Sequence, residues 1–166
     1  MSANSRYSGV ELPSPLISFQ NNHKAEESSR DLSVEVTHEG GCHCGAVKWE
    51  FVGGESLTVW DCNCSICRMK GNFHTIIPKS KFKLLSDPSN LTTYTFNTKQ
   101  AKHMFCKKCG VQSFYHPRSN PDGIGIQVYC IQSKTIKNIT FATYNGLNWE
   151  DAYKKLETTI SQFSKL

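Results

Sequence analysis

Seven of the eight cysteines fall into three short motifs, and these are the side chains whose types and spacing most clearly indicate chemistry. The motifs are Cys42-His-Cys44, Cys62-Asn-Cys64-Ser-Ile-Cys67 and Cys106-Lys-Lys-Cys109, and Cys130 stands alone. Cysteines two or three positions apart can turn both thiolates toward one ion, as they do in tetrahedral zinc sites. The spacing therefore indicates metal binding, and four buried small apolar side chains are the simpler alternative.

Two of the motifs predict a structural site with four protein ligands. Gly110 directly follows the Cys106-x-x-Cys109 pair and gives the backbone the freedom that a tight turn requires. The Cys42-x-Cys44 pair, which also lies among glycines, is its simplest partner. His43 lies between two ligands, and we do not expect it to bind the ion, because successive strand residues point to opposite faces. The predicted structural zinc ligands are Cys42, Cys44, Cys106 and Cys109.

The remaining motif offers three ligands, Cys62, Cys64 and Cys67. Catalytic zinc sites commonly have three protein ligands and one position for water or substrate. A thiol that binds there is deprotonated and becomes a nucleophile at neutral pH. Two alternatives stay open: a redox dithiol at Cys64-x-x-Cys67 and a structural site with a fourth ligand from elsewhere. The candidates for that fourth ligand are His74, His103, His116 and Cys130.

The elements that must position these cysteines read as short strands. Nine runs rich in β-branched and aromatic residues are bounded by Gly, Pro, Asn and Asp turn residues. Strands do not alternate with helices, so we expect a mostly β fold and no doubly wound sheet. The predicted strands are Ser33–His38, Ala46–Val52, Leu57–Asp61, Phe73–Pro78, Phe82–Leu85, Leu91–Phe96, Lys102–Phe105, Gln112–His116 and Gly125–Cys130.

The two ends of the chain differ from this pattern. Apolar residues recur at helical spacing from Trp149 to Phe163, which predicts one amphipathic C-terminal helix capped by Asn148, with Asp151 at its third position. Residues 1–33 mix Ser, Asn, Pro and charges without periodicity, and we predict a disordered tail there. The folded domain is expected over residues 34–166.

Composition and charge limit the classes of function. Residues 1–36 hold three basic and five acidic side chains, so the rest of the chain, with 16 basic and nine acidic residues, has a net charge of +7, which attracts anions of any kind. The apolar runs are too short to span a membrane. The N-terminus shows no signal-peptide pattern, so we expect an intracellular protein, cytoplasmic or nuclear, whose thiols stay reduced.

The cysteine motifs carry a resemblance to a known family. The runs Gly40–Val47, Cys62–Gly71 and His103–Phe114 resemble the glutathione-dependent formaldehyde-activating (GFA) family. The runs Tyr115–Gly123 and Tyr144–Ala152 resemble its eukaryotic branch, which includes centromere protein V. The resemblance covers about Val34 to Tyr153 and implies a zinc-bearing β-tent of several small coiled antiparallel sheets. It implies the same two groups of zinc ligands as the spacing does.

The resemblance also implies an activity. Members of the family are named for the condensation of formaldehyde with glutathione to S-hydroxymethylglutathione, a carbon–sulfur lyase reaction. This chain would then hold two zinc ions and take glutathione as its co-substrate. An acid must protonate the alkoxide that forms, and the sequence offers four candidates for it. They are His103, His116, Arg118 and Lys70.

A second hypothesis is a zinc module that binds protein or nucleic acid without catalysis. Lys99, Lys102, Lys107 and Lys108 surround the last cysteine pair, and Lys79, Lys81 and Lys83 alternate on a predicted strand face. Such lysines could contact phosphates, but no aromatic residues are interleaved with them as in recognised nucleic-acid motifs. A third hypothesis is a family member in which both zinc ions are structural.

Overall fold

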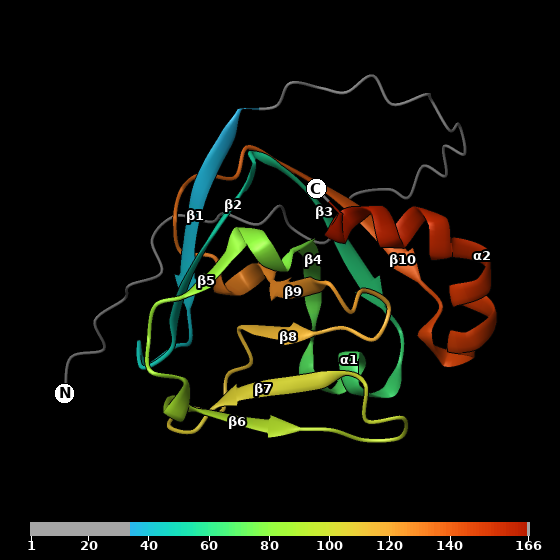
Figure 1. Cartoon of the computed structure of the whole chain (residues 1–166), viewed down its shortest axis with the longest axis horizontal. Helices are drawn as coiled ribbons and strands as arrows, with labels where there is room; N and C mark the ends of the chain where they lie inside the picture. Colours follow the sequence, from blue (N-terminus) through green and yellow to red (C-terminus); the bar gives the residue numbers. More distant parts are fainter. Residues whose placement is uncertain (1–33, 166) are drawn as a thin grey trace. The chain divides into compact units, whose positions relative to one another are not determined.

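The computed structural model describes residues 34–165, in which strands and turns predominate (Figure 1). The tail predicted to be disordered, residues 1–33, lies outside the described residues. A three-stranded antiparallel sheet has the order β1-β2-β5, and a seven-stranded sheet has the order β10-β3-β4-β9-β8-β7-β6. The small sheet contains β1 (Glu35–Gly41), β2 (Lys48–Gly54) and β5 (Phe82–Leu84). The large sheet contains β3 (Ser56–Cys62), β4 (Phe73–Pro78), β6 (Leu91–Tyr94), β7 (Lys102–Cys106), β8 (Phe114–His116), β9 (Gly123–Gln127) and β10 (Asn138–Tyr144).

The expected mostly β fold class with one C-terminal helix is confirmed, and each predicted run overlaps a strand. Two further elements were not predicted. β10 pairs with β3 in parallel, so the large sheet is mixed. Its sequence is rich in Thr, Phe and Tyr, which is a strand composition, but no Gly or Pro turn marks its start. Helix α1 (Ser65–Lys70) has only six residues and is too short to show helical periodicity.

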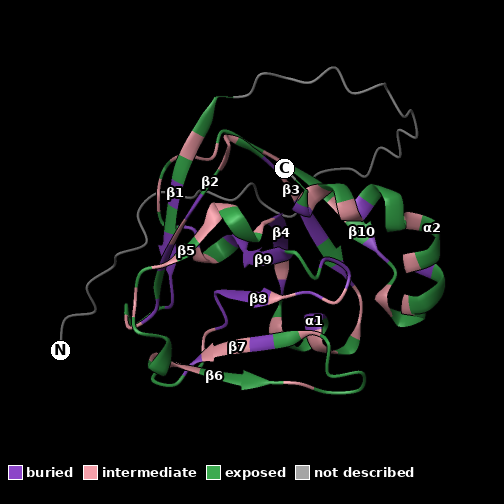
Figure 2. Ribbon diagram, in the orientation of Figure 1, coloured by how far each residue is buried: buried purple, intermediate pink, exposed green. Residues whose placement is uncertain are grey.

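Two apolar cores lie on opposite faces of the large sheet. The first core packs Trp49 and Phe51 of β2 against Val59, Phe114 and Ile126 of the large sheet. Figure 2 shows the buried residues concentrated along β4, β8 and β9, the strands at the centre of the large sheet. This first core joins the two sheets.

The second core lies between the large sheet and helix α2 (Trp149–Ser161). It packs Trp60 of β3, Ile76 of β4 and Tyr144 of β10 against Ala152 and Ile160 of α2. Alternation along β3 explains the division, because adjacent residues of a strand point to opposite faces. Val59 therefore enters the first core and Trp60 the second.

The C-terminal helix begins where the periodicity predicted. Asn148 occupies the N-cap position, but its side chain accepts no backbone hydrogen bond; its Nδ2 instead donates to Asp151 Oδ2 at 2.9 Å. Glu150 and Asp151 lie in the first turn, where the helix dipole favours negative charge. None of the helices in residues 34–165 combines the length and the apolar character that crossing a membrane requires.

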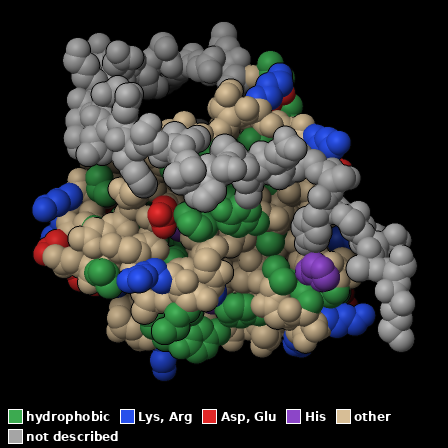
Figure 3. Space-filling model, turned by 180° about the vertical axis from the view of Figure 1, so that it is seen from behind, with side chains coloured by type: hydrophobic (Ala, Val, Ile, Leu, Met, Phe, Trp, Pro, Cys, Tyr) green, Lys and Arg blue, Asp and Glu red, His purple; other side chains and the backbone are tan. Residues whose placement is uncertain are grey.

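The prediction that Lys79, Lys81 and Lys83 alternate on one strand face is wrong. Lys79 and Lys81 lie in a short 3₁₀ turn, Lys79–Lys81, and only Lys83 lies in a strand. Lys81 forms an ion pair with Glu35, and Lys83 forms one with Glu50 at 3.1 Å. On the face drawn in Figure 3, the visible Lys and Arg side chains are separated from one another by neutral surface.

Candidate metal centres and the adjoining cavity

Two turns of the same design build the first group of cysteines. In one turn, Cys42 N donates to Val47 O at 3.0 Å and Gly45 N donates to Cys42 O at 3.1 Å. The turn over residues 106–111 repeats both hydrogen bonds at 3.0 and 2.9 Å. Gly45 and Gly110 have φ angles of 76° and 72°, in the left-handed region that favours glycine. Each turn thereby curls its two cysteines toward one point.

The structure brings Cys42, Cys44, Cys106 and Cys109 together, and we call them the four-cysteine cluster. Their sulfur atoms all lie within 4.8 Å of one another, and Cys44 Sγ is 3.6 Å from both Cys42 Sγ and Cys106 Sγ. Tetrahedral zinc with Zn–S bonds of about 2.3 Å requires sulfur–sulfur distances of about 3.8 Å. The donor set fits zinc. His43 is exposed in the turn and lies outside this group.

The second group, which we call the three-cysteine cluster, comes from β3 and α1. Cys62 ends β3, Cys64 is the N-cap of α1, and Cys67 lies inside that helix. Their three sulfur atoms also lie within 4.8 Å of one another. Gly71 ends α1 in the left-handed conformation, with φ of 59°. One strand end and one short helix are therefore sufficient to build this cluster.

The proposed fourth ligands do not join the three-cysteine cluster. Among the described residues, no other Cys and no His, Asp or Glu groups with these three sulfur atoms. His74 and His103 lie in the wall of the adjoining cavity, and His116 does not. Cys130 packs against the first core instead, where burial raises the pKa of its thiol to about 12.

The three thiols compete for one negative charge. The pKa of Cys64 is lowered because the side chains of Cys62 and then Cys67 donate hydrogen bonds to its thiolate. The pKa of Cys67 is raised because its thiol donates its proton in hydrogen bonds to Cys62 and Cys64. Further ionisation places like charges side by side, which a divalent cation offsets. The chemistry of this donor set therefore also fits a metal ion.

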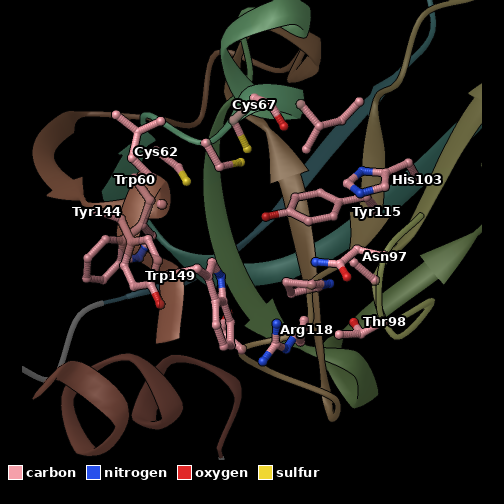
Figure 4. A pocket seen from close by; sticks show the side chains of 18 of the residues that line it. Trp60, Cys62, Cys67, Asn97, Thr98, His103, Tyr115, Arg118, Tyr144 and Trp149 are labelled. Atoms are coloured by element: carbon pink, nitrogen blue, oxygen red, sulfur yellow. The ribbon is translucent and has the colours of Figure 1, made fainter. Parts of the chain in front are cut away.

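A cavity of about 510 Å³ adjoins the three-cysteine cluster. All three of its cysteines line this cavity, and no member of the four-cysteine cluster does. In Figure 4, Trp60 and Tyr144 lie on one side of the cavity, Tyr115 and His103 lie on the other, and Arg118 faces the cysteines across it.

A cation and an aromatic ring close the end of the cavity opposite the cysteines. The guanidinium carbon of Arg118 lies 3.6 Å from the ring centroid of Trp149, a cation–π contact. Arg118 Nη2 also lies 2.5 Å from Glu150 Oε1. This end of the cavity therefore offers both a positive and a negative group.

The turn after β10 covers the three-cysteine cluster. Asn63 Oδ1 accepts a hydrogen bond from Leu147 N at 3.0 Å, which holds the turn in place. A Cβ atom on Gly146 would lie 2.6 Å from both Cys62 Sγ and Cys64 Cβ, closer than side chains tolerate. Only glycine fits here without displacing the cysteines, and the sequence motifs gave no sign of this.

A chain of hydrogen bonds connects the cluster with the cavity wall. Lys70 Nζ donates to His103 Nδ1 at 2.9 Å and to Gln112 Oε1 at 2.7 Å. Gln112 Nε2 donates to Asn72 Oδ1 at 3.2 Å, and Asn72 Nδ2 donates to Cys67 Sγ at 3.6 Å. Burial lowers the pKa of Lys70 to about 8, so the ammonium persists at neutral pH. Because an ammonium only donates, it fixes the direction of the whole chain.

Tyr115 is held rigidly beside this chain. Its ring stacks on His103 with centroids 5.5 Å apart and planes 6° apart, and it passes over Gly125, where a Cβ would lie 2.3 Å from the ring. Its hydroxyl points into the cavity on the side of the cysteines (Figure 4). Burial raises the pKa of Tyr115 well above its usual value, so the phenol keeps its proton.

The structure separates the candidates that the sequence offered. His103 and Arg118 line the cavity, Lys70 contacts it through His103, and His116 lies outside the lining. Tyr115 was missed as a candidate acid. Alternation could have found it, because Phe114 of the same strand enters the first core, so its neighbour must point to the opposite face.

The fold is mostly β and carries one four-cysteine and one three-cysteine cluster, each of which could hold a metal ion on thiolates, the second beside a cavity. Residues 37–145 match the model of the glutathione-dependent formaldehyde-activating enzyme (GFA) family, and the chain belongs to this family. A Rhodobacter sphaeroides protein of known crystal structure is 32% identical, with a TM-score of 0.53. That similarity covers 61% of this chain and 99% of the bacterial one. The resemblance to the GFA family is thus confirmed, and the assignment to its eukaryotic branch stays a prediction.

Proposed function

We propose that this protein binds two zinc ions and condenses formaldehyde with glutathione to S-hydroxymethylglutathione, which is carbon–sulfur lyase chemistry. The observation that carries the proposal is the cavity beside the three-cysteine cluster. Its volume of about 510 Å³ falls in the range of small-molecule sites, about 300–1,000 Å³. The four-cysteine cluster has no part in that cavity, which supports a structural role for its ion.

The cavity offers suitable groups for glutathione. Zinc on Cys62, Cys64 and Cys67 would supply a low thiol pKa, so that the substrate binds as a thiolate at neutral pH. Glutathione also carries two carboxylates and an ammonium. The Arg118–Glu150 pair at the far end presents both charges that such a peptide needs.

The bond-forming step needs one proton donor. The substrate thiolate adds to the carbonyl carbon of formaldehyde, the new C–S bond forms, and the π electron pair of the carbonyl moves to its oxygen. Tyr115 donates its hydroxyl proton to that alkoxide and regains a proton from solvent. The reverse sequence removes the hydroxyl proton and breaks the C–S bond. The position of the Tyr115 hydroxyl, which points into the cavity on the side of the cysteines, supports this role (Figure 4).

We place the chain in the eukaryotic branch of the family, with centromere protein V. The runs Tyr115–Gly123 and Tyr144–Ala152, which resemble that branch, supply Tyr115, Arg118 and Trp149 to the cavity wall. The residues that distinguish this branch would therefore contribute to substrate binding.

Native mass spectrometry of the purified protein, with and without glutathione, tests the proposal. We expect two zinc ions and one bound glutathione per chain. Cys64→Ser should keep the ion of the four-cysteine cluster and lose the glutathione. Cys130→Ser is the matched control, because Cys130 lies outside both clusters, and it should keep both ions and the thiol.

A single zinc ion, or two without bound glutathione, would overturn the proposal. The second hypothesis, a zinc module that binds protein or nucleic acid, would then be favoured. For nucleic acid, the affinity for a DNA or RNA duplex should fall steeply with salt, because phosphate contacts release counterions.

A further inference from the structure

Hydrogen-bond donors without partners gather at the cavity. Among the described residues, five buried side-chain polar atoms make no hydrogen bond: Trp60 Nε1, His103 Nε2, Tyr144 Oη, Asn120 Oδ1 and Gln127 Oε1. The first three belong to residues that line the cavity, and the two amide oxygens do not. Leaving one buried polar group unpaired costs about 1–3 kcal/mol. Three such groups around one cavity indicate a ligand that completes them.

The chemistry of these three atoms specifies what the ligand must offer. An indole Nε1–H of Trp60 can only donate. His103 Nδ1 accepts from Lys70, and burial lowers the pKa of His103 to about 4, so the single ring proton is on Nε2. The Tyr144 hydroxyl has one hydrogen to donate and can also accept. All three groups have a hydrogen to donate, so a ligand acceptor satisfies each of them.

The donors are divided between two sides of the three-cysteine cluster. Trp60 and Tyr144 are neighbours, with ring centroids 6.5 Å apart. His103 lies on the other side of the cavity against Tyr115, and the cysteines lie between these two groups (Figure 4). The three side chains are 5, 3 and 5% exposed for Trp60, His103 and Tyr144, so bulk water does not satisfy them.

We propose that Trp60 Nε1 and Tyr144 Oη bind acceptor oxygens at one end of the ligand, and that His103 Nε2 binds an acceptor at the other end. The cavity thereby selects a thiol that is flanked on both sides by carboxylate or carbonyl groups. This inference rests on the proposed function, because it places the thiol at the three-cysteine cluster. Lys70 is a positioning residue, which keeps the proton of His103 on Nε2.

Two conservative variants remove one donor each. His103→Phe keeps an aromatic ring between Tyr115 and Phe96, and Tyr144→Phe loses only the hydroxyl. The matched controls are His116→Phe and Tyr153→Phe, because neither residue lines the cavity. Native mass spectrometry on every variant counts the zinc ions, which should stay at two.

Calorimetry with a panel of thiols reads out the two ends separately. The probes are glutathione, γ-glutamylcysteine, which lacks the glycine, and cysteinylglycine, which lacks the γ-glutamyl group. Each donor variant should bind glutathione about tenfold more weakly, as expected for one hydrogen bond to a charged group. His103→Phe should bind glutathione and one of the two shortened peptides with equal affinity, because the donor for the missing end is already lost. Tyr144→Phe should do the same with the other shortened peptide. The controls should bind like the wild type.

Lys70→Met provides a second route if His103→Phe fails to fold. It leaves the His103 ring in place but removes the donor that fixes its proton, so it should weaken the same end of the peptide as His103→Phe. A loss spread evenly over all probes would contradict this, because it would indicate a structural role only.

The outcomes separate the inference from the proposed function. Unchanged glutathione affinity in both donor variants, or sensitivity of both to the same end of the peptide, overturns the inference alone. S-methylglutathione keeps both ends of the peptide but offers no thiolate. If it binds as tightly as glutathione, thiolate coordination fails, and the donor variants still test the two ends. A wild-type protein that binds none of the probes overturns both.

Discussion

The two cysteine clusters use the same ligand chemistry in different surroundings. In the four-cysteine cluster, two turns supply all four sulfur atoms, and Cys42 and Cys106 are buried in the core between the sheets. In the three-cysteine cluster, a strand end and a short helix supply three, beside a cavity. The comparison teaches that one type of ligand can lie in a closed core or beside a cavity, so the surroundings decide which cluster a small molecule could reach.

Backbone N–H groups donate to sulfur atoms in both clusters, and the three-cysteine cluster has a side-chain donor in addition. Val47 N, a backbone group, donates to Cys42 Sγ at 3.2 Å in the four-cysteine cluster. Asn72, a side chain, donates to Cys67 Sγ in the three-cysteine cluster and belongs to the chain that continues through Gln112 to Lys70. Backbone support depends on the turn alone. Side-chain support links the sulfur to the cavity wall.

Ligand removal should give the largest contrast between the clusters. Cys106→Ser breaks the connection between the β1–β2 turn and the β7–β8 turn, and we expect a loss of unfolding free energy above about 4 kcal/mol, as for lost metal sites. Cys64→Ser should cost less than half of that and keep the fold. Urea unfolding followed by tryptophan fluorescence measures both. Equal losses would favour two structural ions.

Position 146 tests how closely the three-cysteine cluster is packed. Gly146→Val would force its side chain against Cys62 Sγ and Cys64 Cβ, so the cluster should lose its ion and the protein its thiol binding. The zinc count in native mass spectrometry should fall from two to one. Gly53→Ala on β2 is the control, because its Cβ would meet nothing nearer than a Phe51 ring carbon at 3.2 Å. Two ions retained in Gly146→Val would refute the close packing.

Tyr115 tests the chemistry beside the three-cysteine cluster without changing a sulfur. Tyr115→Phe should slow S-hydroxymethylglutathione formation, measured above the spontaneous reaction, by about 100-fold, as for the loss of a general acid. Zinc content and glutathione affinity should stay unchanged. Tyr129→Phe, an exposed tyrosine outside the cavity lining, should react like the wild type. An unaffected rate would assign the proton to another group.

The smallest expected effect is a pH dependence caused by two buried histidines. Burial lowers the pKa of His74 and of His103 to about 4, against about 6.5 in the unfolded chain. Between these values the unfolded chain takes up protons that the folded chain refuses, so stability falls as the pH falls from 6.5 to 4. Each histidine contributes about 1.4 kcal/mol per pH unit within this range.

His103→Phe separates this effect from acid release of the metal. The variant should lose one of the two histidine contributions in urea unfolding at saturating zinc, while metal release affects both proteins alike. If the unfolding free energy changed equally with pH in the wild type and the variant, His103 would not be buried in its neutral form.

Much of the fold followed from local patterns, and the misses have local reasons. The helix from Trp149 was predictable because its apolar residues repeat at helical spacing over several turns. Helix α1 is shorter than two turns and offers no such repeat. The parallel pairing of β10 with β3 joins segments about eighty residues apart, as in Asn138 with Ser56, and no local pattern encodes it.

The sequence by itself determined how the cysteines group, because a spacing of two or three residues decides which thiols can turn toward one ion. Only the tertiary structure decided what lies around each group. Trp60, Tyr115 and Tyr144 come from β3, β8 and β10, and they meet at one cavity because of how the strands pair and which face each residue takes. Gly146 has its role only because the turn after β10 returns to the end of β3. Distant contacts of this kind depend on the packing of the whole chain, so the motifs identify the two cysteine clusters and the fold supplies the cavity beside one of them.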